Sequence, residues 1–176
     1  VLTDRFEGTD GAQLAARSRY AADPDRYFYA DQYNNASNWR AHYRTTAPEI
    51  WEQTDGRVTH FVAGLGTSGT LTGTGRRLKE YDQNIELIAV QPDSPLHGLE
   101  GLKHMQTAIK PGIFDARLPD RTLTVGTEES QAMVKRLARE EGLFVGVSAG
   151  AAVVASLKLA AQIDRGVIVT VFADSA

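Results

Sequence analysis

The feature that most constrains this sequence is an apolar segment, 59–63, that runs directly into a loop of glycines and hydroxyl residues, 64–70. This order is typical of a strand that leads into a helix. The glycines allow the backbone to turn tightly and to approach an anion closely, and the first N–H groups of the helix lack intrahelical acceptors. Thr67, Ser68 and Thr70 add hydroxyl donors. The loop is therefore predicted to bind a phosphate.

Two cofactor classes compete for this loop. Residues 64–69, Gly-Leu-Gly-Thr-Ser-Gly, match the G-x-G-x-x-G pattern of dinucleotide-binding loops, which pair with an acid at the end of the next strand. The next predicted strand, 85–90, is followed by Gln91, with Asp93 two residues later. Three hydroxyl side chains fit a compact phosphate monoester, such as that of pyridoxal phosphate, better than a pyrophosphate diester. A glycine-rich turn that binds no ligand is the third interpretation.

The composition argues against several classes of protein. Of 176 residues, 42% are hydrophobic and 23% are charged, as in a globular domain with one core, or one core and part of another. A net charge of −3 without a long basic run argues against a nucleic-acid surface, and no apolar stretch approaches the roughly 20 residues of a membrane span. The absence of cysteine fits a cytoplasmic protein, and the spacing of the four histidines predicts no metal site.

Helical and extended patterns alternate along the chain, which predicts an α/β domain with a largely parallel sheet. The extended segments are 59–63, 85–90, 122–125, 143–147 and 167–172. The helical segments are 10–22, 39–53, 71–81, 127–141 and the apolar stretch after residue 150. In the first helix, Leu14, Ala15 and Ala21 are expected to face a core. Pro48 is expected to start or kink the second helix, and Thr127 to cap the fourth.

Three further features are candidates for a ligand-binding role. Segment 31–38 carries four carboxamide side chains within seven residues. These side chains either stabilise turns or form an edge that faces a ligand. Segment 92–119 is long, irregular and rich in glycine and proline, as in an active-site flap. The predicted strand 143–147 places Ser148 at a strand end, where α/β enzymes collect their site residues.

Five stretches together resemble the cysteine synthase family of pyridoxal phosphate enzymes, which includes cystathionine β-synthase as a near neighbour. They are 32–35, 45–51, 66–70, 90–92 and 141–150, in the order and at the spacing of the family. Segments 59–62 and 111–116 are most similar to the cysteine synthase B branch. The resemblance implies a three-layer, parallel-sheet domain of the tryptophan synthase β-subunit type, incomplete at both ends. Residues 1–35 would end an N-terminal subdomain with a substrate-side loop, and 36–176 would form a truncated C-terminal domain that binds the cofactor phosphate.

The resemblance also implies roles for individual residues. The cofactor phosphate would be held by Gly66, Thr67, Ser68, Gly69 and Thr70. Ser148 would hydrogen-bond the pyridine nitrogen, where a neutral hydroxyl favours β-elimination from a serine ester; a helix N-cap is its alternative role. Gln32 would bind the substrate carboxylate, with a loop-bracing amide as the alternative. Asp174 would lie near the cofactor ring.

The resemblance carries no catalytic lysine onto this chain. The family's Schiff-base lysine, and its loop for the substrate carboxylate, would lie upstream of residue 1. The five lysines of the sequence do not match the lysine motif, so the chain alone is expected to be inactive. In the predicted flap, Lys103 and His104 stand where the B branch has a basic pair, which suggests a role with an anionic substrate.

The expected reaction is therefore β-replacement that forms L-cysteine from O-acetylserine or O-phosphoserine and a sulfur donor. The alternatives are cystathionine β-synthase or a serine/threonine dehydratase of the same fold, and, from another class, a non-catalytic dinucleotide-binding module. The resemblance implies pyridoxal 5'-phosphate as cofactor, a homodimer, serine acetyltransferase as a partner and a cytoplasmic location. The charge, the apolar pattern and the histidine spacing predict no nucleic acid, membrane or metal as a partner.

Overall fold

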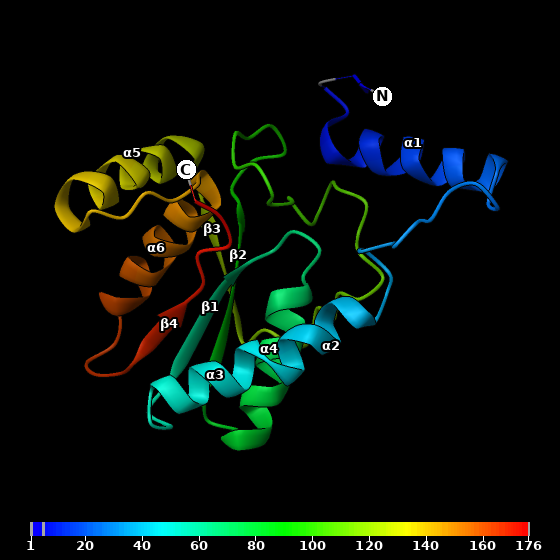
Figure 1. Ribbon diagram of the computed structural model, residues 1–176. Helices are drawn as coiled ribbons and strands as arrows, with labels where there is room; N and C mark the ends of the chain where they lie inside the picture. Colours follow the sequence, from blue (N-terminus) through cyan, green and yellow to red (C-terminus); the bar gives the residue numbers. More distant parts are fainter. Residues whose placement is uncertain (1, 5, 176) are drawn as a thin grey trace.

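The computed structural model describes residues 2–4 and 6–175, and a parallel four-stranded sheet lies at its centre (Figure 1). The strands are β1 (His60–Gly64), β2 (Glu86–Pro92), β3 (Arg121–Val125) and β4 (Ile168–Thr170). Their order across the sheet is β3-β2-β1-β4, and each neighbouring pair is parallel. All carboxyl ends therefore meet at one edge, which is where parallel α/β sheets form their ligand sites.

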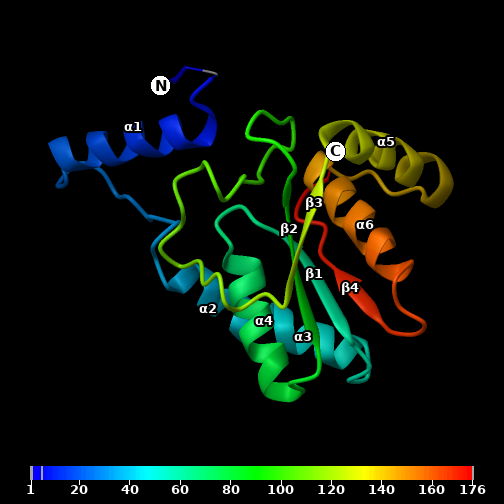
Figure 2. The ribbon, with the colours of Figure 1, turned by 180° about the vertical axis from the view of Figure 1, so that it is seen from behind.

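Helices cover both faces of the sheet, as predicted for a three-layer domain (Figure 2). One face packs on α4 (Gly69–Tyr81), with α2 (Ser37–Arg44) and α3 (Thr46–Gln53) outside it, and the other on α6 (Val147–Ala160), with α5 (Thr127–Arg136) outside it. Strand residues alternate between two cores: Phe61 and Leu87 join the α4 side, while Val62 and Ile88 join the α6 side. Because alternate residues enter the two cores, β1 and β2 are apolar on both faces along most of their length.

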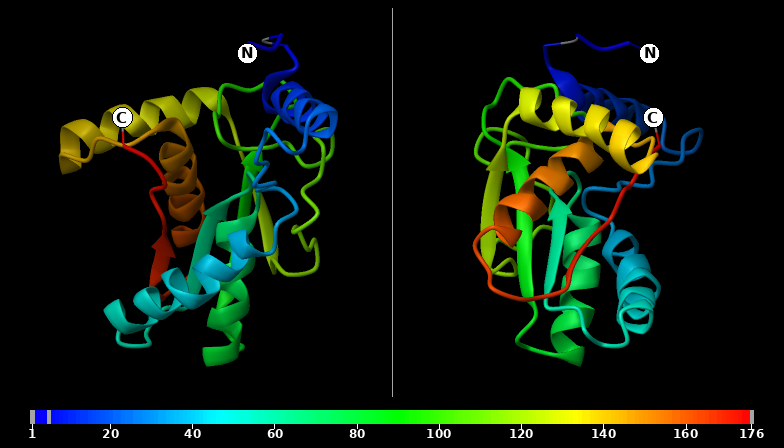
Figure 3. Two further views of the ribbon diagram at one scale, coloured as in Figure 1. Left: turned by 45° about the vertical axis from the view of Figure 1, so that its right-hand side comes forward. Right: turned by 90° about the vertical axis from the view of Figure 1, so that its left-hand side faces the viewer.

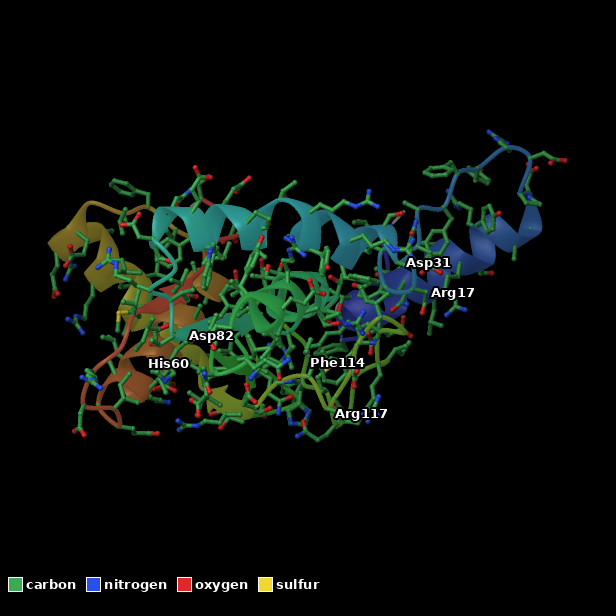
Figure 4. The ribbon with its side chains drawn as sticks, turned by 90° about the horizontal axis from the view of Figure 1, so that it is seen from below. Arg17, Asp31, His60, Asp82, Phe114 and Arg117 are labelled. Carbon is green, nitrogen blue, oxygen red and sulfur yellow. The ribbon has the colours of Figure 1, made fainter. Side chains whose placement is uncertain are left out.

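Helix α1 (Gly8–Ala22) projects from the sheet domain (Figure 3). Figure 4 shows Arg17 and Asp31 on this side of the molecule, far from His60 at the start of β1. The prediction that Leu14, Ala15 and Ala21 face a core is wrong, since all three are exposed. A local helical pattern does not tell which elements lie opposite a face, and this helix buries only Gly11 and Gln13 among the described residues.

The predicted helix 39–53 is two helices, α2 and α3, which are divided at Thr45 rather than at Pro48. Thr45 has φ −121° and ψ −69°, outside the helical range. Pro48 is the third residue of α3, where a missing N–H removes no intrahelical hydrogen bond. Ile50 is buried and Trp51 is half-buried.

The predicted strand 143–147 is not formed. Leu143 and Phe144 are exposed, Val145 makes one isolated antiparallel bridge to Ser175, and Val147 already begins α6. An apolar run of five residues fits a connector as well as a strand, and here it links two helices on one face of the sheet. The preceding helix continues as a π-turn, Leu137–Glu141, and ends at Gly142, whose φ of +69° is the left-handed conformation that glycine adopts readily.

Thr127 is the first residue of α5, not its cap. Gly126 is the N-cap, and its N–H donates to Glu129 Oε1 at 2.8 Å. The Thr127 hydroxyl instead accepts a hydrogen bond from the N–H of Gly98 at 2.9 Å. In the described part of the chain, no helix is long and apolar enough to cross a membrane, and no group of three acidic, histidine or cysteine side chains is placed to hold a metal ion.

Candidate functional site

A cavity of about 410 Å³ lies at the carboxyl ends of β1 and β4. Four segments form its walls: the loop 66–70 after β1, residues 100–102 of the long segment after β2, the start of α6, and the chain that follows β4. The loop 66–70 and Ser148 therefore face one space, although 78 residues separate Thr70 from Ser148 in the sequence.

Ser68 is the most unusual residue of the cavity wall. Its φ of +69° places a residue other than glycine in the left-handed region, and it is the N-cap of α4. The residue is only 2% exposed, and its Oγ is buried without a hydrogen-bond partner. Left-handed backbone and an unsatisfied buried hydroxyl each cost free energy, and such features concentrate at ligand sites.

Asn38 of α2 supports the loop from behind. Its Nδ2 donates to Thr67 Oγ1 at 3.1 Å and to the carbonyl oxygen of Gln32 at 2.7 Å. Its Oδ1 approaches Gly69 so closely that a Cβ at position 69 would overlap it. A side chain at position 69 would therefore displace Asn38 from its contacts with Thr67 and Gln32.

The carboxamide-rich segment forms turns, which is one of the two roles considered from the sequence. Asn34 Nδ2 donates to both oxygens of Asp31, at 2.8 and 2.9 Å, and Asn35 Nδ2 donates to the carbonyl of Ala30 at 3.0 Å; these are turn contacts. Asn38 instead reaches the candidate site. The side chain of Gln32 is exposed and does not line the cavity, so only its backbone is linked to the loop.

Thr70 lies next to His42, with 3.4 Å between Oγ1 and Nε2. The other ring nitrogen, Nδ1, is 3.0 Å from Thr46 Oγ1. Burial lowers the pKa of His42 and so favours the neutral ring, which has one donor and one acceptor nitrogen. A neutral ring suits contacts with two hydroxyl groups, each of which can donate or accept.

Ser148 is the second residue of α6, which corrects the prediction that it ends a strand. Its Oγ donates to Asp174 Oδ1 at 3.4 Å. Gly146 is the N-cap, and a Cβ there would overlap the Asp174 carboxylate. The Val145–Ser175 bridge holds the two chain segments together at this point. Ser148 therefore does not cap its helix: its hydroxyl points to an acid across the cavity rim.

The long segment after β2 lies against the loop, as proposed for a flap. A Cβ at Gly66 would overlap the carbonyl of Gly101, and one at Gly64 would overlap Leu102. Gly101 has φ +86°, which only glycine adopts readily. Lys103 is 3% exposed, and its ammonium pairs with Asp10 of α1 rather than facing the cavity. This geometry argues against a direct contact of Lys103 with an anionic substrate.

The arrangement fits a phosphate monoester joined to a small ring. The loop offers hydroxyls, first-turn N–H groups and the positive end of the α4 dipole, and it holds one buried hydroxyl that lacks a partner. A hydroxyl–carboxylate pair lies on the α6 side of the same cavity. The site can therefore hold a charged group at one end and a polar ring atom at the other.

Comparison with known families identifies the class of cofactor. The family described as pyridoxal-phosphate dependent enzyme matches residues 2–174. The chain belongs to this family. This membership favours pyridoxal phosphate over a dinucleotide as the ligand of the glycine-rich loop, and it supports the resemblance to cysteine synthases drawn from the sequence.

Individual relatives are cysteine synthases. The cysteine synthase of Aquifex aeolicus (strain VF5) is 54% identical over 177 residues, which cover 98% of this chain and 54% of the relative. Cysteine synthase B of Escherichia coli (strain K12) is 37% identical over 174 residues, covering 99% of this chain and 56% of the relative. The crystal structure of an O-acetylserine dependent cystathionine beta-synthase from Helicobacter pylori has a TM-score of 0.89 at 36% identity, covering 100% of this chain and 59% of that one. The chain thus spans about half the length of the curated relatives it matches.

Sequence reasoning missed several residues that shape the site. The sequence marks Asn38 only as part of a polar segment, and it gives no signal for His42, Asp10 or Gly146. Each acts on a residue far away in the sequence, by 29 residues for Asn38 and Thr67 and by 93 for Asp10 and Lys103. A local pattern carries no signal for such pairs; only the excess of carboxamides around Asn38 pointed toward a ligand-facing edge.

Proposed function

We propose that this chain forms the phosphate-binding half of a pyridoxal-phosphate dependent cysteine synthase. The observation that carries the proposal is the single cavity that combines the loop 66–70 with the Ser148–Asp174 pair. Identity of 54% to a cysteine synthase supports the choice of reaction. Residues 36–176 would form the cofactor domain, and residues 1–35 would end a second subdomain, consistent with the projecting helix α1.

Five loop residues would hold the cofactor phosphate: Gly66, Thr67, Ser68, Gly69 and Thr70. The glycines allow close approach of the anion, and the three hydroxyls donate to it. In this proposal the Ser68 Oγ gains the partner that it otherwise lacks. Ser148 would contact the ring nitrogen, and Gln32 would bind the substrate carboxylate from the neighbouring loop after a change of side-chain conformer.

The residues of this chain would bind the cofactor, orient it and shield it from water. When bound, pyridoxal phosphate supplies an electron sink for bond cleavage at the α-carbon of an amino acid. Ser148 would place a neutral hydroxyl at the ring nitrogen, and its single proton, which points to Asp174 in this structure, would turn to that nitrogen when the cofactor binds. Gly101 and Leu102 form one wall of the cavity and would shield a bound cofactor from water. The lysine that the family uses for covalent attachment and proton transfer would come from chain outside these 176 residues.

The substrates in this proposal are an O-activated serine and a sulfur donor. The Helicobacter pylori neighbour is described as O-acetylserine dependent, which favours an acetyl over a phosphate leaving group. The two alternatives are a dehydratase, whose activity the assay described below also detects, and a cystathionine β-synthase. The resemblance to cysteine synthases also supports a homodimer, serine acetyltransferase as a partner and a cytoplasmic location, and the sedimentation behaviour of the full-length protein tests the first.

A cofactor and substrate assay tests the proposal directly. The full-length protein that contains this chain is incubated with pyridoxal phosphate and dialysed, and its visible absorption is recorded. It is then assayed with sulfide and either O-acetylserine or O-phosphoserine. We expect a retained visible band and formation of cysteine from O-acetylserine. A protein that retains no cofactor, or that converts serine or threonine to an oxoacid without making cysteine, contradicts the proposal.

A further inference from the structure

Lys103 is a buried cation outside the cavity. Its side chain is 3% exposed, its ammonium pairs with the carboxylate of Asp10, and it lies 5.0 Å from the ring centroid of Tyr33. A buried charge is costly unless a partner of opposite charge compensates it. By contrast, the pair of Arg136 and Glu140 lies on the surface, where ion pairs contribute little. Loss of one partner should therefore destabilise the structure more at the Asp10–Lys103 pair than at the Arg136–Glu140 pair.

Asp10 contacts the flap at two points. One carboxylate oxygen pairs with Lys103, and the other accepts a hydrogen bond from the N–H of Ile109 at 2.7 Å. A single side chain of α1 therefore fixes two flap positions that are six residues apart. The irregular segment after β2 runs between α1 and the sheet in Figures 1 and 2, in agreement with these contacts.

Lys103 also joins the flap to the phosphate loop through its backbone. Its N–H donates to the carbonyl of Leu65 at 2.7 Å, one residue before the loop 66–70. The three residues that precede it, Glu100, Gly101 and Leu102, line the cavity. A shift of Lys103 would therefore move this wall relative to the loop.

We infer that Asp10 and Lys103 are positioning residues that hold the flap in place as a wall of the cofactor cavity. Neither side chain contacts the cavity itself: the carboxylate of Asp10 locks the ammonium of Lys103 and the N–H of Ile109, and the backbone transmits this to residues 100–102. The inference deepens the proposed function, on which it rests for its effect on cofactor binding. Its effect on the flap itself does not depend on the identity of the ligand.

Asp10 and Lys103 are not equivalent, because Asp10 contacts two flap positions and Lys103 is only one of them. Variants of the two residues should therefore differ in their effects. Asp10→Ala leaves a buried cation without a partner and the N–H of Ile109 without an acceptor, whereas Lys103→Met removes the cation and keeps the Asp10–Ile109 bond. Asp10→Asn retains an acceptor oxygen and removes only the charge, so it separates the two roles even if Asp10→Ala fails to fold. Glu140→Ala, which breaks a surface pair, is the matched control.

The experiment measures protease cleavage within residues 93–120 and cofactor release during dialysis, both in the full-length protein. We expect Asp10→Ala to raise the cleavage rate at least about tenfold and Lys103→Met to raise it less. The double variant has no unpaired cation but lacks the Asp10–Ile109 bond, so its cleavage rate should fall between those of the two single variants. Asp10→Asn should fall between the wild type and Asp10→Ala, and Glu140→Ala should match the wild type. Faster cofactor release should follow the same order.

Two outcomes overturn the inference: strictly additive effects of Asp10→Ala and Lys103→Met, or a flap cleavage rate that neither variant changes. The first means that the two side chains do not act as a pair, and the second that the pair does not hold the flap. If the wild-type protein retains no cofactor, the proposed function fails, whereas the cleavage rates still decide whether the pair positions the flap.

Discussion

Replacing Ser148 by aspartate tests the role of its hydroxyl. The Oγ of Ser148 lies 3.4 Å from Asp174 Oδ1, so a carboxylate at position 148 would lie about 4 Å from a like charge. Two unit charges at that distance repel by about 1 kcal/mol in water and about 4 kcal/mol at an effective dielectric constant of 20. Because Asp174 is exposed and Ser148 half-buried, we take a repulsion of about 1–2 kcal/mol.

The α6 dipole acts in the opposite direction. A negative charge in the first turn of a helix stabilises it by about 0.3–1 kcal/mol. Ser148→Asp should therefore lower the free energy of unfolding by about 1 kcal/mol, and Ser148→Ala, which loses one partly exposed hydrogen bond, by about 0.5–1 kcal/mol. Adding Asp174→Asn to Ser148→Asp removes the repulsion and retains the dipole term, so the double variant should regain wild-type stability. Denaturant unfolding monitored by circular dichroism measures all three differences.

The same variants separate stability from chemistry. With a carboxylate at the ring nitrogen, the ring stays protonated and β-elimination from O-acetylserine should slow, even in the double variant that has regained its stability. Stopped-flow absorption of the cofactor during the first turnover measures this rate. A Ser148→Asp/Asp174→Asn protein that is stable and eliminates at the wild-type rate would refute the contact between Ser148 and the ring nitrogen.

Three further predictions concern the loop and its support. Thr70→Ala in the full-length protein should weaken cofactor binding by roughly 1.5–3 kcal/mol, measured by equilibrium dialysis, whereas Thr122→Ala at an exposed position of β3 should leave it unchanged; equal affinities would contradict the loop assignment. Because burial lowers the pKa of His42 below its usual 6.5, the unfolded chain takes up its proton more readily, and the free energy of unfolding should fall as the pH drops below about 6.5. His42→Asn should flatten this decline, and an unaltered pH profile would contradict the reasoning. Gly150→Ala should lower stability by about 1–3 kcal/mol in thermal unfolding, since its Cβ would overlap the carbonyl of Ser130 in α5, and a neutral effect would mean that the two helices separate easily.

The sequence predicted those parts of the fold that are encoded locally. The strand, glycine loop and helix around residues 60–81 follow from an apolar run, glycines and helical periodicity that lie next to one another. The segment 143–147 was predicted wrongly because an apolar run does not state whether a neighbouring strand is available to pair with it. Helix α1 was predicted as a helix but with a buried face that it does not have, because the pattern does not show what lies opposite.

The same distinction between local sequence and tertiary packing applies to the candidate site. The loop residues were identifiable because one short segment contains all of them, and their roles stay predictions. The contacts of Asn38 with Thr67, of Ser148 with Asp174 and of Asp10 with Lys103 join distant segments, so they depend on tertiary packing. Ser148 shows the consequence: its location was predicted to be a strand end, but the first turn of α6 and an acid from the chain after β4 define its surroundings.

If the loop 66–70 binds the cofactor as proposed, the left-handed backbone and unpartnered hydroxyl of Ser68 make the stability of the protein depend on the supply of cofactor. A ligand that binds only the folded state adds RT ln(1 + [L]/Kd) to its stability, about 2.7 kcal/mol at a hundredfold excess over Kd. In that case the bound cofactor would give the hydroxyl of Ser68 a partner and support the loop, whereas without cofactor the junction of β1 and α4 keeps a left-handed residue with an unsatisfied hydroxyl. A cell short of vitamin B6 would then lose this protein through degradation as well as through lost catalysis.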